Sequence, residues 1–197
     1  MSSSLACLAL HFQNEVVHEN GKIRLGVGDE ARRKGLIAAA ERLLAAARKA
    51  EIPVISVRIA FRPDFRDVIQ NCRIFKGVVA SQAMADGSWG AEFFAGLGPL
   101  PGEFVVKHSR INAFYGSPLE EVLSGLGVRR LIVAGVATNS TVEHSVRHAS
   151  DLGFDVLVAR DACSAADPAL HEASLQNMAF VADVLTVDEI ISRELSA

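Results

Sequence analysis

The fold is decided by residues 130–142, which read RLIVAGVATNSTV. Residues 130–135 form an almost wholly apolar run, which is typical of a strand covered on both faces of a sheet. The polar residues that follow begin a helix predicted from about Thr138 to Leu152. A strand that leads directly into a helix is part of a βαβ unit, so this stretch indicates a parallel sheet.

The same alternation extends along the chain in both directions. Short runs rich in Val, Ile and Leu predict strands at residues 5–10, 53–59, 104–107, 155–159 and 181–185. Amphipathic stretches predict a helix from the N-cap Asp29 to Arg48, and further helices at residues 118–126, 168–179 and 188–195. Right-handed crossovers would place helices on both faces. The expected fold class is therefore α/β: a three-layer Rossmann-like fold with a six-stranded, mostly parallel sheet.

Residues 60–102 do not follow this alternation. Arg, Asp, Gly and Pro are mixed there with aromatic residues such as Phe61 and Trp89, and no long helix or strand is predicted. A connection of this length is usually a functional loop or lid. The alternative is an irregular segment that only covers a sheet edge or a neighbouring subunit.

Length, composition and charge narrow the class of protein. A chain of 197 residues, half of them apolar, favours one domain over residues 1–197. The net charge of −3 and the scattered cations leave no basic stripe for a nucleic acid. No secretory signal or membrane span is visible, and the odd number of cysteines, three, suits a cytoplasmic location. No cofactor or metal is expected, because His144 and His148, four residues apart, lack a third ligand.

In open parallel sheets, ligands bind outside the carboxyl ends of the strands. His11 and Gln13 follow the first predicted strand, Lys107 closes the third, and the segment from Val136 to Thr141 follows the fourth. If the strand order reverses beside the first strand, these ends meet around one crevice.

Four segments follow the motif pattern of a known family. Residues 9–14 match an apolar strand that ends in Asp-x-Gln-Asn, and residues 113–117 match Ala-Phe-x-Gly-Thr downstream of a catalytic Lys, here Lys107. Residues 135–142 match Gly-Val-x-Thr-x-x-Cys-Val, and Asp161-Ala162 match a terminal Asp-Ala. Over nearly its whole length the chain thus resembles the isochorismatase-like, or cysteine hydrolase, superfamily, which includes nicotinamidases, carbamoylsarcosine amidohydrolases and isochorismatases.

The resemblance implies a hydrolase whose catalytic residues His11, Lys107 and Thr141 share one cleft. The chain differs from the family's pattern at two of these positions. His11 stands in place of the family's Asp, and Thr141 stands in place of its nucleophilic Cys. A homo-oligomer and a cis peptide bond between Val136 and Ala137 are implied as well. The expected substrate-binding residues are Gln13, Phe61, Trp89, Phe114, Val136 and Ala137.

The two departures leave several mechanisms open. A threonine hydroxyl is far less acidic than a thiol, so Thr141 could act as a nucleophile only with a base such as His11. Alternatively, His11 or Lys107 handles protons without a covalent intermediate, as in true isochorismatases, and Thr141 only donates or accepts a hydrogen bond. Cys163 could replace the missing nucleophile. In the last alternative, the pocket has lost its chemistry.

Among the active forms, acid-base catalysis without a Cys nucleophile is the favoured interpretation, acting on a small, anionic metabolite. If Lys107 and His11 lie side by side in the cleft, these two cationic groups would favour such a ligand. Its carboxylate could be bound by Arg58, Arg62, Arg66 or Arg73. The alternative is a catalytically inactive small-molecule binding or regulatory protein on the same scaffold.

Overall fold

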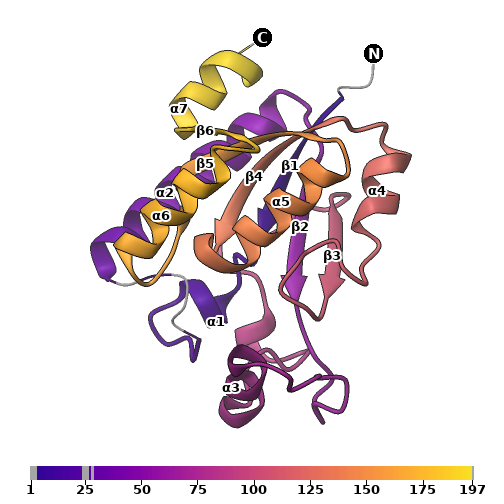
Figure 1. Ribbon diagram of the computed structural model, residues 1–197, viewed down its shortest axis with the longest axis vertical. Helices are drawn as coiled ribbons and strands as arrows, with labels where there is room; N and C mark the ends of the chain where they lie inside the picture. The colour runs from indigo at the N-terminus through magenta and orange to yellow at the C-terminus, as the bar shows by residue number, and fades with distance from the viewer. Residues whose placement is uncertain (1–3, 24–26, 28, 197) are drawn as a thin grey trace.

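The computed structural model describes residues 4–23, 27 and 29–196. Its strands form one six-stranded sheet in the order β3-β2-β1-β4-β5-β6, and every neighbouring pair is parallel (Figure 1). The predicted α/β class and the parallel sheet are confirmed. The strands are β1 (Leu5–Leu10), β2 (Val54–Ile59), β3 (Phe104–His108), β4 (Arg130–Val136), β5 (Asp155–Ser164) and β6 (Asp183–Leu185).

Helices connect the strands where the sequence pattern predicts them. Asp29 caps the long helix α2 by accepting a hydrogen bond from the Arg32 amide, and Thr186 forms a capping box with Glu189 at the start of α7. Six helices lie between strands, and a seventh, α7, follows the last strand. They are α1 (Asn14–Val17), α2 (Glu30–Lys49), α3 (Arg73–Ser81), α4 (Leu119–Gly125), α5 (Glu143–Asp151), α6 (Pro168–Met178) and α7 (Val187–Ile190). Shorter helical turns are η1 (Trp89–Ala91), η2 (Thr138–Val142) and η3 (Ile191–Leu195).

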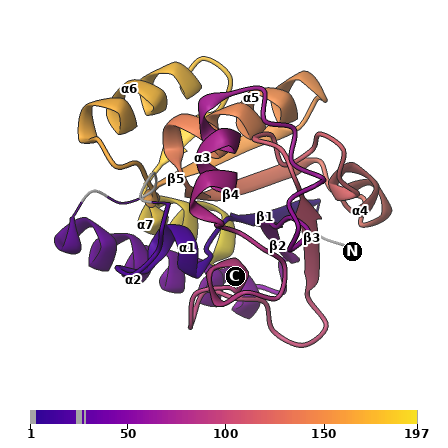
Figure 2. The ribbon, with the colours of Figure 1, turned by 90° about the horizontal axis from the view of Figure 1, so that it is seen from below.

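The two faces of the sheet are buried by different helices, because side chains alternate along each strand. In β1, Cys7 and Ala9 face a core formed with α2 and α7, whereas Leu8 and Leu10 face a core formed with α4, α5 and α6. The views in Figures 1 and 2 show α2 on one side of the sheet and α5 and α6 on the other. Both faces are therefore dry, which explains the apolar strands.

The structure corrects three sequence predictions. Residues 60–102 contain the helix α3 and the turn η1, where no long element was predicted, and α3 buries Phe75 and Val78 in a small separate core. The helix predicted from Thr138 to Leu152 is divided into η2 and α5, since Asn139 departs from helical geometry. The strand β5 continues to Ser164, past the predicted end at Ala159, because its last residues pair with β4 beyond a bulge.

The strand order reverses between β1 and β4, so the connections after these strands leave toward opposite faces and a crevice opens between them. At this point Gly135 pairs with Leu10. A Cβ atom on Gly135 would lie 2.2 Å from the Leu10 carbonyl oxygen, and the glycine φ is +147°. Glycine is therefore required for the two strands to meet here. Within the described ranges, no helix has the length and apolar composition needed to span a bilayer.

We predict that Gly135→Ala lowers the free energy of unfolding by more than about 2 kcal/mol, because the added methyl group would push β1 and β4 apart. Urea unfolding measures this loss. The matched control is Gly125→Ala in α4, where an added Cβ meets no atom within 4 Å. The control should change stability by less than about 1 kcal/mol. Equal stability of the two variants would contradict this explanation.

Candidate active site

Three side chains from distant parts of the sequence meet at the carboxyl end of the sheet. His11 follows β1 in a left-handed backbone conformation with φ +55°, which turns its ring into the crevice. Its Nδ1 lies 3.4 Å from the Thr141 hydroxyl in η2, and its Nε2 lies 2.5 Å from Nε2 of His108 at the end of β3. All three residues are at most 5% exposed. The predicted meeting of His11 and Thr141 is thus present, with His108 as an additional member.

The hydrogen bonds of this group have one consistent direction. His108 Nδ1 lies 3.1 Å from the Asn112 carbonyl oxygen, which can only accept, so Nδ1 carries the hydrogen and Nε2 of a neutral His108 is an acceptor. His11 must then donate from Nε2, which leaves its Nδ1 lone pair to accept from the hydroxyl of Thr141. The Asn112 carbonyl therefore decides which nitrogen of His11 can act as a base.

Burial keeps both imidazoles neutral. It lowers the pKa of His108 from 6.5 to about 4, and only the bond to Asn112 acts in the opposite direction. The pKa of His11 is held well below its usual value, first by burial and then by the repulsion of a charged His108. At neutral pH the crevice thus contains two uncharged histidines, and the Nδ1 lone pair of His11 faces the Thr141 hydroxyl.

Lys107 is not part of this group. Its side chain is 55% exposed and pairs with Asp86, Nζ to Oδ2 at 3.1 Å, and Arg58 of the neighbouring strand pairs with the same carboxylate. These cations hold the pKa of Asp86 below its usual range. The structure does not place Lys107 in one cleft with His11 as expected, because alternation along β3 turns Lys107 outward and His108 inward.

A small inner cavity of about 50 Å³ adjoins His11 and Thr141. Its floor includes Val136 and Ala137, joined by the predicted cis peptide bond, and its roof is the apolar side of α3. An outer cavity of about 550 Å³ shares several of the same wall residues and opens toward α6. The residues that line the inner cavity are His11, Val16, Ile23, Ile59, Ile74, Phe75, Val78, Met84, Arg110, Ile111, Val136, Ala137, Ser140 and Thr141.

Four residues predicted to contact substrate do not line the inner cavity. The Gln13 side chain is fully buried, and its amide bonds to the backbone of Ile59 and to the Ala91 carbonyl, so it joins β2 to the 84–91 segment. The three aromatic residues are occupied elsewhere. Phe61 packs against Phe75 in the small core, Phe114 stacks on His148, and Trp89 is 51% exposed with its ring against His18.

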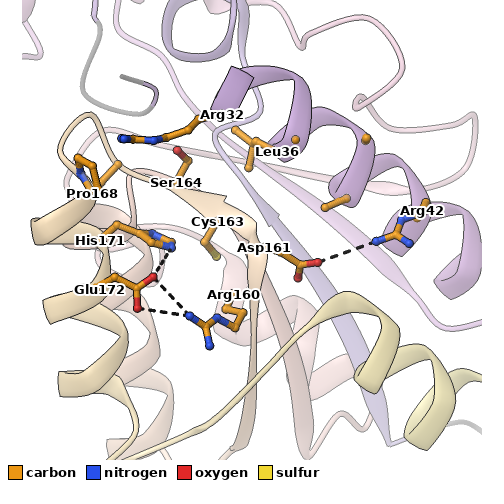
Figure 3. Close-up of a pocket in the computed structure, with 14 residues that line it drawn as sticks. Arg32, Leu36, Arg42, Arg160, Asp161, Cys163, Ser164, Pro168, His171 and Glu172 are labelled. Atoms are coloured by element: carbon orange, nitrogen blue, oxygen red, sulfur yellow. Dashed lines mark hydrogen bonds and ion pairs between the residues drawn. The ribbon is translucent and has the colours of Figure 1, made fainter. Parts of the chain in front are cut away.

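Cys163 lies in a different cavity, of about 440 Å³, between α2 and α6 (Figure 3). Burial raises the pKa of its thiol to about 12, so the thiolate needed for attack is disfavoured. The arginines of this cavity are paired with acids, for example Arg160 with Glu172 and Arg42 with Asp161 and Asp188. The site therefore offers no unpaired charge to a ligand, and it does not bring Cys163 to His11.

Sequence reasoning missed His108, Arg110 and the roof formed by α3. The alternation of Val106, Lys107 and His108 along a strand was an available signal for His108, because Val106 and His108 must share a face. No comparable signal indicated that α3 covers the crevice. Within the described part of the chain, no group of three or more His, Cys, Asp or Glu side chains could hold a metal ion.

Comparisons with known proteins agree with this architecture. Residues 5–189 match the isochorismatase domain family. The chain is 27% identical to ureidoacrylate amidohydrolase RutB of Methylorubrum extorquens, covering 95% of this chain and 82% of the relative. It is 29% identical to the uncharacterized isochorismatase family protein YecD of Escherichia coli O157:H7, covering 78% and 80%.

Solved structures show the same fold. A cysteine hydrolase from Pseudomonas syringae pv. phaseolicola superposes with a TM-score of 0.87 at 23% identity, covering 96% of this chain and 92% of the other. An isochorismatase family protein from Desulfovibrio vulgaris superposes with a TM-score of 0.84 at 27% identity, covering 96% and 99%. Since the family match spans most of the chain, this protein belongs to the isochorismatase family.

Proposed function

We propose that this protein is a hydrolase of a small amide-type substrate, in which His11 is the general base and His108 orients it. The observation that supports this is the directional hydrogen-bond series from the Thr141 hydroxyl through His11 and His108 to the Asn112 carbonyl. A nucleophile, a base and an orienting group in series is the arrangement that activates hydroxyl nucleophiles.

The proposal includes the departure from the usual family pattern. His11 and Thr141 stand where the resemblance implies an Asp and a nucleophilic Cys, and His108 takes the place beside His11 that was predicted for Lys107. A helix terminus alone cannot ionise a threonine hydroxyl, whereas a neutral imidazole in contact with it can accept the proton as the oxygen attacks.

The neutral state of the pair favours attack on a carbonyl group over protonation of a vinyl ether. A vinyl ether must receive a proton before it is hydrolysed. Because the pKa values of both histidines are lowered, neither ring is protonated at neutral pH, so neither has an extra proton to donate. A neutral base can still assist addition of an oxygen nucleophile to an amide. The relative named ureidoacrylate amidohydrolase supports the same reaction class.

In the proposed reaction, His11 Nδ1 takes the proton from Thr141, or from a water held by it, as that oxygen bonds to the carbonyl carbon. The lone pair of His108 Nε2 stabilises the imidazolium formed at His11 through their hydrogen bond. His11 then returns the proton to the leaving nitrogen when the carbon–nitrogen bond breaks. If Thr141 is the attacking group, a water activated by His11 releases the acyl group from it.

The alternative hypothesis is a binding protein that keeps the pocket and does not hydrolyse its ligand. The 3.4 Å separation between Thr141 and His11 supports it, since this is longer than a strong hydrogen bond. The variants described next distinguish the two hypotheses. The expected homo-oligomeric state and cytoplasmic location stay predictions.

We predict that His11→Gln lowers kcat roughly 100- to 10,000-fold on a small-amide substrate found by direct assay, because the base in contact with Thr141 is lost. His108→Gln should also lower kcat, since it removes the acceptor that orients His11. Steady-state kinetics on folded protein, checked by circular dichroism, measures both effects.

Two control variants accompany this test. Lys107→Ala and His144→Gln remove a cation paired with Asp86 and an exposed histidine, and both should leave kcat within about threefold of the wild type. Loss of turnover in Lys107→Ala with retention in His108→Gln would restore the lysine assignment and contradict the proposal.

Replacement of Thr141 distinguishes a nucleophile from a contact. If Thr141 attacks the substrate, we expect Thr141→Ala to lose turnover almost completely and Thr141→Ser to retain part of it, since serine keeps the hydroxyl. Mass spectrometry of the rapidly quenched wild type should then detect an acyl adduct on the peptide that contains Thr141. Turnover in Thr141→Ala within about tenfold of the wild type would instead assign the attack to water.

The buried histidines predict a dependence of stability on pH. The unfolded chain binds a proton at His108 near pH 6.5, whereas the folded protein resists it until about pH 4. The contribution is therefore fully present above pH 6.5 and is lost as the pH falls toward 4, by about 3 kcal/mol for His108. Urea unfolding from pH 7.5 to 4 should show a shallower loss in His108→Gln than in His144→Gln. Equal slopes would mean that His108 is not buried as a neutral group.

A further inference from the structure

Two threonines of the short helical turn η2 each contact a histidine. Thr141 faces His11 in the crevice, whereas the hydroxyl of Thr138, three residues earlier, contacts a different histidine, His171 of α6. Thr138 Oγ1 lies 2.8 Å from His171 Nδ1, a short distance for a hydrogen bond between neutral groups. Thr138 is fully buried, so water does not compete for its hydroxyl. One turn of chain thus connects the α6 histidine with the candidate catalytic hydroxyl.

The direction of the Thr138–His171 hydrogen bond follows from a neighbouring carboxylate. Nε2 of His171 lies 4.0 Å from Oε1 of Glu172, as the dashed line in Figure 3 marks. A carboxylate only accepts, so it favours the tautomer that carries the hydrogen on Nε2. Burial lowers the pKa of His171, so the ring is neutral at neutral pH and Nδ1 keeps its lone pair. Thr138 is therefore the donor and His171 the acceptor.

The turn η2 has no side-chain cap of its own to fix its direction. Its N-cap residue is Ala137, which offers no acceptor atom on its side chain, and Asn139 departs from helical geometry. Contacts from α6 take this role. Besides the His171 ring, the hydroxyl of Ser174, one helical turn further along α6, lies 3.1 Å from the Thr138 carbonyl oxygen. The helix α6 thus holds both the side chain and the backbone of Thr138.

The position of η2 decides whether Thr141 reaches His11. Their hydrogen-bonding atoms are 3.4 Å apart, near the limit for such a bond, so a displacement of about 0.5 Å away from β1 would break it. A misplacement of about 1 Å at a reacting group can lower a rate roughly 100-fold. The helix α6 is a firm support, because Asp167 caps its first turn and Leu175 and Met178 are buried against the sheet.

Building on the proposed function, we infer that His171 is a positioning residue, which holds η2 where Thr141 meets His11 by accepting the hydrogen bond of Thr138. His171 lines the cavity between α2 and α6 (Figure 3) and is not among the residues that line the inner cavity. It therefore acts on the reaction through Thr138 and the backbone of η2. Its loss should affect the chemical step more than the binding of substrate.

The first test observes the hydrogen bond of His11 without a substrate. The ¹⁵N chemical shift of a neutral imidazole nitrogen reports whether its lone pair accepts a hydrogen bond. The Nδ1 signal of His11 is identified by its loss in His11→Gln, and Thr141→Val gives its position when the bond is absent. We expect His171→Leu and Thr138→Val to move the signal to that position, because each removes one partner of the bond that holds η2.

Conservative variants separate a positioning role from general damage to α6. His171→Asn keeps an acceptor at the δ position and Thr138→Ser keeps the hydroxyl, so both should retain the wild-type signal of His11. Gln176→Leu, on the exposed face of α6, is the matched control and should leave the signal unchanged.

The second test measures turnover on the substrate found for the proposed reaction. His171→Leu should lower kcat roughly 10- to 100-fold and leave KM within about threefold of the wild type. His171→Asn should recover most of this loss. Thr138→Val should have the same effect as His171→Leu, and the double variant should lose no more than either single variant, because both remove one interaction.

Two outcomes would overturn the inference: an unchanged His11 signal in Thr138→Val, or an effect of His171→Asn as large as that of His171→Leu. Since Thr138→Val leaves α6 intact, it decides the question even if His171→Leu does not fold. The two proposals fail separately. If His11→Gln keeps its turnover, the proposed base is wrong, while the chemical shift of His11 still tests whether His171 holds η2.

Discussion

The hydrogen bond between the buried imidazoles of His11 and His108 is the interaction on which the candidate site depends. It is possible only if one ring donates and the other accepts, and the Asn112 carbonyl decides which ring does which. That choice exposes a lone pair of His11 to Thr141. A positively charged ring in either position would disrupt this order, and burial of both rings opposes it.

The pair of buried histidines differs from an ion-paired site in the charge state of its members. A carboxylate and a lysine in contact would stabilise each other's charged forms, whereas two histidines away from water stay neutral. A neutral base is always available at neutral pH, but its low pKa makes it weaker. Among the described residues that line the inner cavity, Arg110 alone carries a charge at neutral pH, and its hydrogen-bond acceptors are neutral.

The roof of the cavity has a structural role that the sheet cannot supply. Residues of α3 cover the crevice with Ile74, Phe75 and Val78, and Phe75 also supports the guanidinium of Arg110. The Gln13 side chain also holds the segment between β2 and β3, because its amide donates a hydrogen bond to the Ala91 carbonyl oxygen. The long segment between β2 and β3 is therefore hydrogen-bonded to Gln13, which follows β1, and its helix α3 forms one wall of the inner cavity.

The sequence by itself determined the parallel sheet, the main helices, the cis peptide at Val136 and the meeting of His11 with Thr141. The sheet and the helices follow from local periodicity and capping residues, and the meeting of His11 with Thr141 follows from the rule that parallel strands end at one edge. The cis peptide was implied by the family resemblance. Only the tertiary structure decided that His108 lies inward and Lys107 outward, that Gln13 is structural, and that Arg110 faces the cavity. Each of these outcomes depends on which side of a strand or loop packs against distant segments of the chain. The preferences of the local sequence do not specify that side.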